Sequence, residues 1–262
     1  MVKKNKQDYT VQSVCHAIDI LEAFSGNESE FGVTELSRKL SLPKNNIFRL
    51  LATLKSRGYI EKNETSDNYR LGIRVFELGQ IFQRRMGLLK QAHPVMEDLQ
   101  LKINESVYLA ILQETDVVYI DLVETTHSVR IVSRLGRRAP AYCTSVGKIM
   151  LAYESNDEIS RFFNKVKLDH EARNTIQDRK TLCKCLGKIE KQGYAIDDEE
   201  FEEEVRCVAA PVFDYTRRVV AGIGITGPLL RMSPERIKNE LVPLVKDAGK
   251  EISRRLGYWV EN

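Results

Sequence analysis

The stretch TELSRKLSLPKNNIFRLLATL, residues 34–54, decides the fold of the N-terminal third of this chain. Its first half places Leu36 and Leu40 one helical turn apart after Thr34, a residue suited to the N-cap, which predicts a short helix. Only residues 41–43 separate this helix from the next, and their proline suits the first helical position, where a missing N–H costs nothing. Two short helices joined this tightly predict a helix-turn-helix.

The second helix of this pair has two unlike faces. Apolar residues recur at helical spacing and define one buried stripe: Ile47, Leu50, Leu51 and Leu54. The opposite face carries side chains of the kind that hydrogen-bond base edges and phosphates in the major groove: Lys44, Asn45, Asn46, Arg49 and Thr53. Taken singly, each of these residues also fits an ordinary solvated helix face. The ordered succession of helix, tight turn, polar helix and hairpin favours DNA recognition.

The flanking segments complete a winged helix-turn-helix over residues 10–72. A first helix runs from Val11 to Phe24 and stops at a glycine, Gly26. After the helix pair, two short strands joined by a polar turn form the wing, on which we expect Tyr69 and Arg70 to contact DNA, together with Thr34. Residues 1–90 hold 15 Lys and Arg against 10 Asp and Glu, whereas the remainder holds 25 against 27. This basic excess suits a polyanionic partner, although surfaces that bind nothing also carry it.

The composition is that of a globular protein with room for two cores. The chain has 262 residues, of which 42% are hydrophobic and 29% charged, and a net charge of +3. Its apolar runs are too short to cross a bilayer, and no apolar segment follows the basic N-terminus, so we expect a cytoplasmic protein without a membrane partner. Five cysteines without framework spacing predict reduced thiols.

Residues 73–89 are too apolar for a solitary solvated helix linking two domains. Eight large apolar side chains lie there: Ile73, Phe76, Leu78, Ile81, Phe82, Met86, Leu88 and Leu89. They could pack against the chain's own two domains. We favour pairing with the same helix of a second subunit, because helix-turn-helix proteins gain affinity by binding two half-sites as dimers.

The remaining residues, 90–262, predict an α+β domain with an antiparallel sheet flanked by helices. After a helix through Ile103, the strands are expected at 107–112, 117–123, 129–134, 194–197, 205–215 and 219–226. Further helices are expected at 145–153, 156–165, 181–191 and 234–256. Neighbouring strands are joined by short turns, which favours an antiparallel sheet over a doubly wound parallel one.

A candidate anion site lies between residues 133 and 152. A basic strand end enters a loop at Pro140 and then a helix capped by Thr144 or Ser145. Backbone N–H groups at the start of that helix, those of Ser145, Val146 and Gly147, would hold a carboxylate without any side-chain charge. The alternative is a plain N-cap, which stabilises the helix by about 1 kcal/mol and binds nothing.

The residues quoted above resemble the IclR family of bacterial transcription regulators. The likeness covers residues 34–37, 42–54, 58–60 and 69–72, and continues at 140–152 and 193–212. It implies an N-terminal winged helix-turn-helix, a linker helix and a C-terminal GAF/PAS-like sensor domain. It also implies a homodimer, or a dimer of dimers, that binds a double-stranded DNA operator. Asn45 and Asn46 depart from the Ser-Thr pair of most members, so operator contacts there need not match theirs.

The resemblance also implies a pocket for a small effector in the C-terminal domain. Six residues are carried over from the family's pocket: Tyr142, Thr144, Ser145, Gly147, Asp197 and Cys207. Gly224 stands where many members have a serine, which leaves Thr226 as the hydroxyl on that strand. Residues 133–140 are similar to the subgroup that responds to sugar acids such as 2-keto-3-deoxygluconate. The expected function is a repressor of a carbohydrate or organic-acid catabolic operon whose operator affinity changes with a carboxylate effector.

Other functions find little support in the sequence. Cys143, Cys207 and His170 could form a thiol and base pair, but no nucleophile signature surrounds them, so no catalytic residue is expected. Cys183 and Cys185 point apart on a helix, the histidines have no chelating spacing, and the acidic run 197–204 lacks the glycine of a calcium loop. We therefore expect neither a metal nor a cofactor. A constitutive regulator with a degenerate sensor domain remains the competing binding function.

Overall fold

The computed structural model describes residues 10–25, 29–85, 87–132 and 135–259, without the side chains at 25, 80 and 82–85. The chain divides into two compact units, residues 1–85 and 86–262, which are described one at a time. The predicted stop at Gly26, residues 133–134 of a predicted strand and Met86 of the predicted linker lie outside the described residues.

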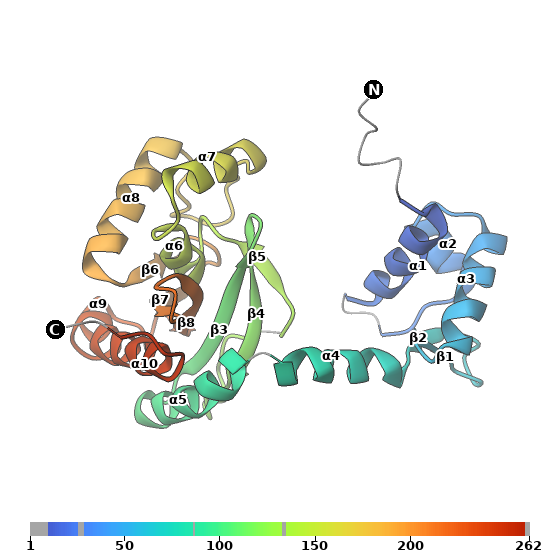
Figure 1. The fold of residues 1–262 in the computed structure, drawn as a ribbon, viewed down its shortest axis with the longest axis horizontal. Coiled ribbons are helices and arrows are strands. Elements are labelled where there is room, and N and C mark those ends of the chain that lie inside the picture. Colours follow the sequence, from blue (N-terminus) through green and yellow to red (C-terminus); the bar gives the residue numbers. More distant parts are fainter. Residues whose placement is uncertain (1–9, 26–28, 86, 133–134, 260–262) are drawn as a thin grey trace. The chain divides into compact units, whose positions relative to one another are not determined.

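The first unit is a winged helix-turn-helix (Figure 1). Its elements are α1 (Gln12–Glu22), η2 (Ala23–Ser25), α2 (Val33–Lys39), α3 (Lys44–Ser56), β1 (Ile60–Lys62), β2 (Tyr69–Leu71) and α4 (Ile73–Arg85). β1 and β2 pair antiparallel and form the predicted wing. The predicted stripe of α3 is confirmed, because Ile47, Leu51 and Leu54 are buried and Leu50 packs beside them.

Two hydrogen bonds between Ser37 and Leu42 close the turn between α2 and α3. The Ser37 hydroxyl donates to the Leu42 carbonyl at 2.6 Å, and the Leu42 N–H donates to the Ser37 carbonyl at 3.1 Å. Ser41 adopts a left-handed conformation, with φ +56°, to close the turn. Both helix starts differ from the prediction by a residue or two.

The N-cap of α2 is Gly32 rather than Thr34, which lies inside the first turn. The carboxylate of Glu35 accepts the Gly32 N–H at 2.8 Å, so the helix begins earlier without a side-chain cap from threonine. Pro43 is the N-cap of α3 instead of its first helical residue, and its carbonyl accepts the Ile47 N–H at 3.1 Å.

The second unit is built on a six-stranded antiparallel sheet with strand order β5-β4-β3-β8-β7-β6. The strands are β3 (Ser106–Gln113), β4 (Asp116–Val123), β5 (Arg138–Pro140), β6 (Ala195–Asp198), β7 (Val205–Phe213) and β8 (Val219–Pro228). The central pair, β3 with β8, joins segments far apart in sequence and sets Ser106 opposite Thr226.

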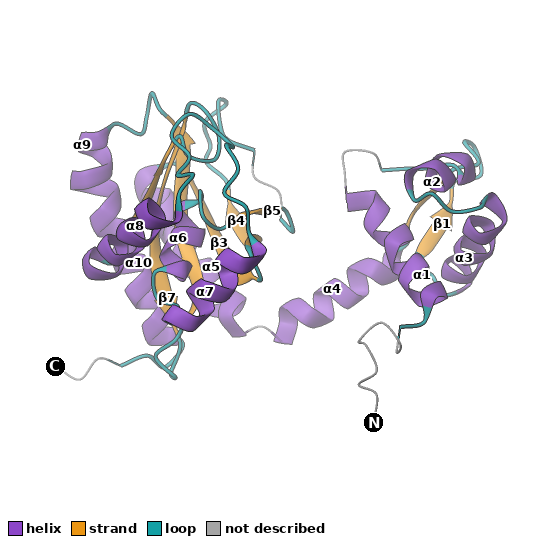
Figure 2. Cartoon of the chain, turned by 90° about the horizontal axis from the view of Figure 1, so that it is seen from above, coloured by secondary structure: helices purple, strands orange, loops and turns teal. Residues whose placement is uncertain are grey.

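Helices cover both faces of this sheet (Figures 1 and 2). One face packs against α5 (Gly87–Ile103), the π-helical turn η3 (Ile237–Leu241) and α10 (Val242–Arg255), and the short α9 (Pro234–Arg236) leads into η3. The other face packs against α6 (Ser145–Leu151), α7 (Asn156–Lys165) and α8 (Arg179–Gln192). Side chains alternate between the two cores: Val107 and Leu109 of β3 face the first, whereas Tyr108 and Ala110 face the second. The α+β prediction is confirmed.

The predicted strand at 129–134 is wrong for its described part. Residues 129–132 form no ladder, and the side chains of Val129 and Val132 are exposed. The Val129 carbonyl instead accepts a hydrogen bond from Arg231, at 3.0 Å, so it is not available to a neighbouring strand. The strand that pairs with β4 on the edge opposite β3 is β5, which begins four residues beyond the predicted end.

Candidate functional site

The recognition face of α3 presents the predicted polar residues to solvent. Lys44, Asn45, Asn46, Arg49 and Thr53 are all exposed. The Thr53 hydroxyl donates to the backbone carbonyl of Arg49 at 2.9 Å, so this bond does not occupy the Arg49 guanidinium. Within the described part of the chain, neither Lys44 nor Arg49 has an ion-pair partner, so both cations are available to a phosphate or a base edge.

The other three predicted DNA contacts fall in different surroundings. Thr34 is exposed on α2, and Arg70 is exposed on the wing, where it lies 3.3 Å from the Glu61 carboxylate. Tyr69 is only 6% exposed, because its ring belongs to the core and its backbone bridges to Phe31. The structure therefore places the Tyr69 ring inside the unit and away from the surface that α3 presents.

Sequence reasoning missed Phe48, which is 57% exposed on α3. In the helical repeat, Phe48 falls outside the buried stripe of Ile47, Leu50, Leu51 and Leu54. This position alone would have predicted from the sequence that its side chain is exposed. An exposed phenylalanine on such a helix can contact a thymine methyl group in the major groove.

In the second unit, a cavity of about 30 Å³ lies on the α6 side of the sheet. Its walls come from several strands, the start of α6 and the loops beside them. The lining residues are Tyr108, Tyr119, Ile131, Arg137, Thr144, Asp197, Phe201, Glu202, Val205, Cys207 and Thr226. The structure thus brings four predicted effector residues together around one space: Thr144, Asp197, Cys207 and Thr226.

Asp197 is the buried acid of this cavity. It lies on β6, is 3% exposed, and its Oδ1 accepts the Glu200 N–H at 2.8 Å. Burial raises the pKa of Asp197 to about 7, although the nearby Lys148 ammonium acts in the opposite direction. That ammonium is itself buried, paired with the Glu200 carboxylate, and donates to the Ile196 carbonyl at 2.6 Å. Burial therefore favours the protonated form of Asp197 more than in an exposed aspartate.

Cys207 and Thr226 lie opposite each other on neighbouring strands. The Cys207 Sγ donates to the Thr226 Oγ1 at 3.2 Å, and the two residues are direct partners in the β7–β8 ladder. Burial raises the pKa of the Cys207 thiol well above its usual range, which keeps the sulfur protonated. This pair therefore offers neutral hydrogen-bonding groups to a ligand.

Tyr108 occupies the space beside Gly224. The Tyr108 and Ser145 hydroxyl oxygens lie 3.1 Å apart, so the predicted residue Ser145 contacts a lining residue without lining the cavity itself. A β-carbon on Gly224 would stand 2.5 Å from the Tyr108 ring, which is closer than van der Waals contact allows. In this chain the Tyr108 ring therefore leaves no space for a serine side chain at position 224.

The remaining predicted residues lie away from the cavity. The Tyr142 hydroxyl donates to the Asp169 carbonyl at 3.1 Å, and Val146 and Gly147 are buried within α6. The predicted Thr144 cap is present, because its Oγ1 accepts the Gly147 N–H at 3.2 Å. That bond engages one of the three amides expected to hold a carboxylate. The anion site at the start of α6 stays a prediction that depends on the other two.

Seven cavity residues were not expected from the sequence: Tyr108, Tyr119, Ile131, Arg137, Phe201, Glu202 and Val205. Arg137 is the basic side chain among them; its guanidinium lies 3.0 Å from the Glu202 carboxylate and over the Phe201 ring. The alternation of the strand at 107–112 was a usable signal for Tyr108, because it puts that tyrosine on the face opposite Val107 and Leu109.

The described residues supply no arrangement for thiol or metal chemistry. The Cys143 Sγ donates to the Pro140 carbonyl at 3.7 Å, while His170 is exposed and is not a partner of that sulfur. Burial raises the pKa of the Cys143 thiol, opposite to what a nucleophile needs. Within the described ranges, no group of three His, Cys, Asp or Glu side chains could hold a metal ion. Nor is any described helix both long and apolar enough to span a bilayer.

Comparison with known families and proteins gives full-length matches. Residues 13–64 match the IclR helix-turn-helix domain, and residues 81–254 match the family described as bacterial transcriptional regulator IclR C-terminal. The HTH-type transcriptional regulator KdgR of Escherichia coli K12 is 37% identical over 254 residues, covering 97% of this chain and 96% of that protein. These matches are to transcription regulators and not to enzymes.

Solved structures agree with these matches. The crystal structure of the Thermotoga maritima IclR is 32% identical, with a TM-score of 0.78 over 94% of this chain and 99% of that one. An IclR homolog from Microbacterium hydrocarbonoxydans, complexed with 4-hydroxybenzoate, is 22% identical, with a TM-score of 0.82 over 93% of this chain and 98% of that one. The second likeness shows the shared fold.

Proposed function

Since this chain belongs to the IclR family of bacterial DNA-binding transcription regulators, we propose that it is a ligand-responsive repressor of a carbohydrate or organic-acid catabolic operon. A small carboxylate effector binds in the second unit and alters the affinity of the first unit for its operator. The observation that carries this proposal is the convergence of Asp197, Cys207 and Thr226, from three different strands, on one cavity. The protein would act in the cytoplasm, where the operator DNA is.

DNA binding is assigned to α3 and the wing. The exposed amides of Asn45 and Asn46 suit adenine edges, and Arg49 suits a guanine edge or a phosphate. Lys44 at the start of the helix and Arg70 on the wing are placed for the phosphate backbone. Such contacts make affinity fall with added salt, because bound cations are released from the DNA.

The effector class follows from the groups that line the cavity. Arg137, whose guanidinium is also paired with Glu202, and the capped start of α6 at Thr144 favour a carboxylate, while Asp197 and Thr226 can bond to hydroxyl groups. A sugar acid carries both kinds of group. The likeness of residues 133–140 to the sugar-acid subgroup supports 2-keto-3-deoxygluconate as the first compound to test.

The regulator is proposed to act as a homodimer. Large apolar side chains are exposed on two helices of the first unit: Val14 and Ile18 on α1, with Val11 at its N-cap, and Ile73, Phe76, Leu78 and Ile81 on α4. Exposed apolar side chains in such number suit an interface with another protein surface. Pairing these helices with those of a second copy would bury them and set two α3 helices for two half-sites.

The direct test is a binding assay with the full-length protein and a labelled duplex from the region upstream of its own gene. Anisotropy is read at several salt concentrations, with and without 2-keto-3-deoxygluconate, gluconate or pyruvate. We expect an acid of this class to change DNA affinity roughly 5- to 150-fold. DNA affinity that does not change with any of the acids would favour a constitutive regulator. If the protein shows no specific DNA binding at all, the proposal is overturned.

A further inference from the structure

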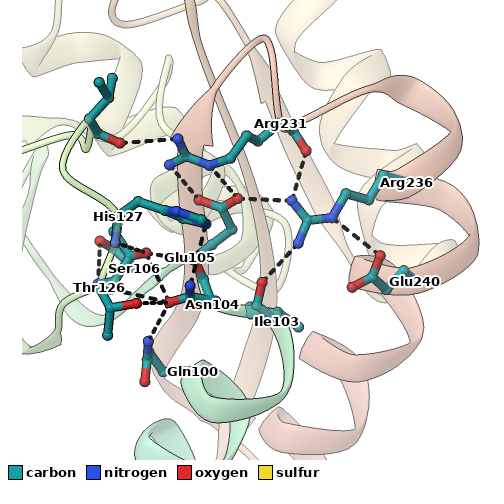
Figure 3. Close-up of polar contacts among 12 residues, drawn as sticks. Gln100, Ile103, Asn104, Glu105, Ser106, Thr126, His127, Arg231, Arg236 and Glu240 are labelled. Atoms are coloured by element: carbon teal, nitrogen blue, oxygen red, sulfur yellow. Dashed lines mark hydrogen bonds and ion pairs between the residues drawn. The ribbon is translucent and has the colours of Figure 1, made fainter.

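Glu105 is a completely buried carboxylate between the end of α5 and the start of β3 (Figure 3). Arg231 binds it with two parallel hydrogen bonds, from Nε at 2.8 Å and from Nη2 at 2.9 Å. Arg236 adds a third from Nη1 at 2.8 Å. These three residues are called the Glu105 cluster below. Charge-assisted bonds of this number compensate the cost of burying the carboxylate.

One side of the cluster reaches the wall of the cavity. The remaining Nη1 of Arg231 donates to the Val129 carbonyl at 3.0 Å. Val129 belongs to residues 124–132, which have no helix or strand structure, and Ile131 of the same segment lines the cavity. Arg231 therefore fixes the base of the wall that carries Ile131.

The other side of the cluster reaches the end of α5. Arg236 donates from Nη2 to the carbonyl of Ile103, the last residue of that helix, at 2.8 Å. α5 begins two residues after α4 ends in the sequence. The Glu105 cluster is therefore bonded to the helix that follows directly on the DNA-binding unit.

The cluster is packed too tightly for its two sides to move independently. Ser106, next to Glu105, pairs with the cavity residue Thr226 across β3 and β8. At the neighbouring Gly227, a β-carbon would stand 3.0 Å from both the Glu105 Oε2 and the Met232 side chain. Little room is left for a shift of the carboxylate that is not passed to its partners.

The size of the cavity requires a wall to move when a ligand enters. About 30 Å³ holds roughly two water molecules, far less than a sugar acid needs. Most lining residues come from sheet strands or from the start of α6, whereas Ile131, Arg137, Phe201 and Glu202 come from irregular segments. Of these four, Ile131 lies in the segment that Arg231 holds through the Val129 carbonyl. Displacing that wall would pull on the Val129 carbonyl and so on Arg231.

We infer that Glu105, Arg231 and Arg236 are positioning residues for the effector response, which link the Ile131 wall of the cavity to the C-terminal end of α5. The inference rests on the proposed function, because it deepens how ligand entry reaches the DNA-binding unit. An arginine is needed at position 231, because a planar guanidinium can bind a carboxylate in two places and still donate to a carbonyl. A lysine makes no such forked contact.

The link is tested first without ligand, by hydrogen–deuterium exchange on the full-length protein. Arg231→Gln and Arg236→Gln each remove one arm. If the cluster transmits motion, each variant speeds amide exchange at both ends, residues 124–132 and residues 100–104. An effect confined to the variant's own side would overturn the inference. Arg254→Gln, which breaks an ion pair with Glu251 on α10, is the matched control and should change neither segment.

Lysine variants at positions 231 and 236 keep the charge beside Glu105 and decide the same question if the glutamine variants do not fold. A second measurement compares DNA affinity with and without saturating 2-keto-3-deoxygluconate. We expect both variants to bind DNA and the probe, while the ratio of the two DNA affinities falls towards one. An unchanged ratio would contradict the link. A wild-type protein that ignores the probe counts against the proposed effector, and the exchange result still decides the role of the cluster.

Discussion

The phenol ring of Tyr108 on β3 lies against Gly224 on β8, so closely that a β-carbon at position 224 would stand 2.5 Å from the ring. Replacing Gly224 by alanine must displace a fully packed tyrosine. We expect Gly224→Ala to lower the free energy of unfolding by about 1–3 kcal/mol through overpacking, measured by urea denaturation.

The same substitution in a Tyr108→Ala background separates this cause from others. With the ring removed, the added methyl group has space, and the cost of Gly224→Ala should fall. The double-mutant cycle then gives a coupling energy between positions 108 and 224. Equal costs in both backgrounds would mean that the ring is not the obstacle.

Burial of Asp197 makes stability depend on pH in a defined direction. Because burial raises its pKa to about 7, the folded protein binds this proton more tightly than the unfolded chain does. Its contribution is fully present below about pH 4 and is lost as the pH rises to about 7. We expect a slope of up to about 1.4 kcal/mol per pH unit across that window.

Asp197→Asn removes this titration and should flatten the slope, as measured by unfolding at a series of pH values. Some slope should remain, because burial also raises the pKa of Glu200. A stability difference between wild type and Asp197→Asn that does not change between pH 4 and pH 7 would contradict the assignment.

The recognition face of α3 is tested by Arg49→Ala. Loss of one guanidinium contact should weaken operator binding by about 1–3 kcal/mol, or roughly 5- to 150-fold, in the anisotropy assay. Lys55→Ala is the matched control, since Lys55 is exposed on the same helix but points about 120° away from Arg49 around the helix axis. Equal losses for the two variants would indicate a general charge effect instead of groove contacts.

The apolar surface of α4 is tested by Phe76→Glu. Phe76 is 62% exposed, so the substitution should leave each unit folded while placing a charge in the proposed dimer interface. Burying an unpaired charge costs several kcal/mol, so the dimer should dissociate at concentrations where the wild type stays paired. Sedimentation velocity measures this. Leu230→Glu, at a 96% exposed position in the second unit, should not change the oligomeric state.

Local pattern was enough to predict most of the DNA-binding unit. The spacing of Ile47, Leu51 and Leu54 fixes which face of the helix is buried, and the other residues of the helix form its exposed face. Tyr69 shows the limit of that reasoning, because the sequence does not reveal that its strand turns the ring inward beside Phe31. The start of α2 was also misplaced, because the Glu35 carboxylate accepts the Gly32 N–H three residues earlier and the helix begins before the expected Thr34 cap.

The cavity could be predicted only in part, because it depends on contacts between distant segments. Asp197, Cys207 and Thr226 were expected from a family resemblance, whereas Ile131 enters the cavity from a segment wrongly expected to be a strand. In that segment the Val129 carbonyl accepts a hydrogen bond from Arg231, and these two residues are separated by about 100 residues of sequence. No local periodicity reports such a contact.

The pairing of β3 with β8 affects the order in which the two units can fold during synthesis. Ser106 can pair with Thr226 only after Thr226 has been synthesised, whereas the first unit is a compact unit of residues 1–85. At bacterial synthesis speeds this delay is on the order of ten seconds. A newly made chain can therefore fold its helix-turn-helix while the sheet of the second unit is still incomplete, and the proposed ability to respond to a ligand is acquired last.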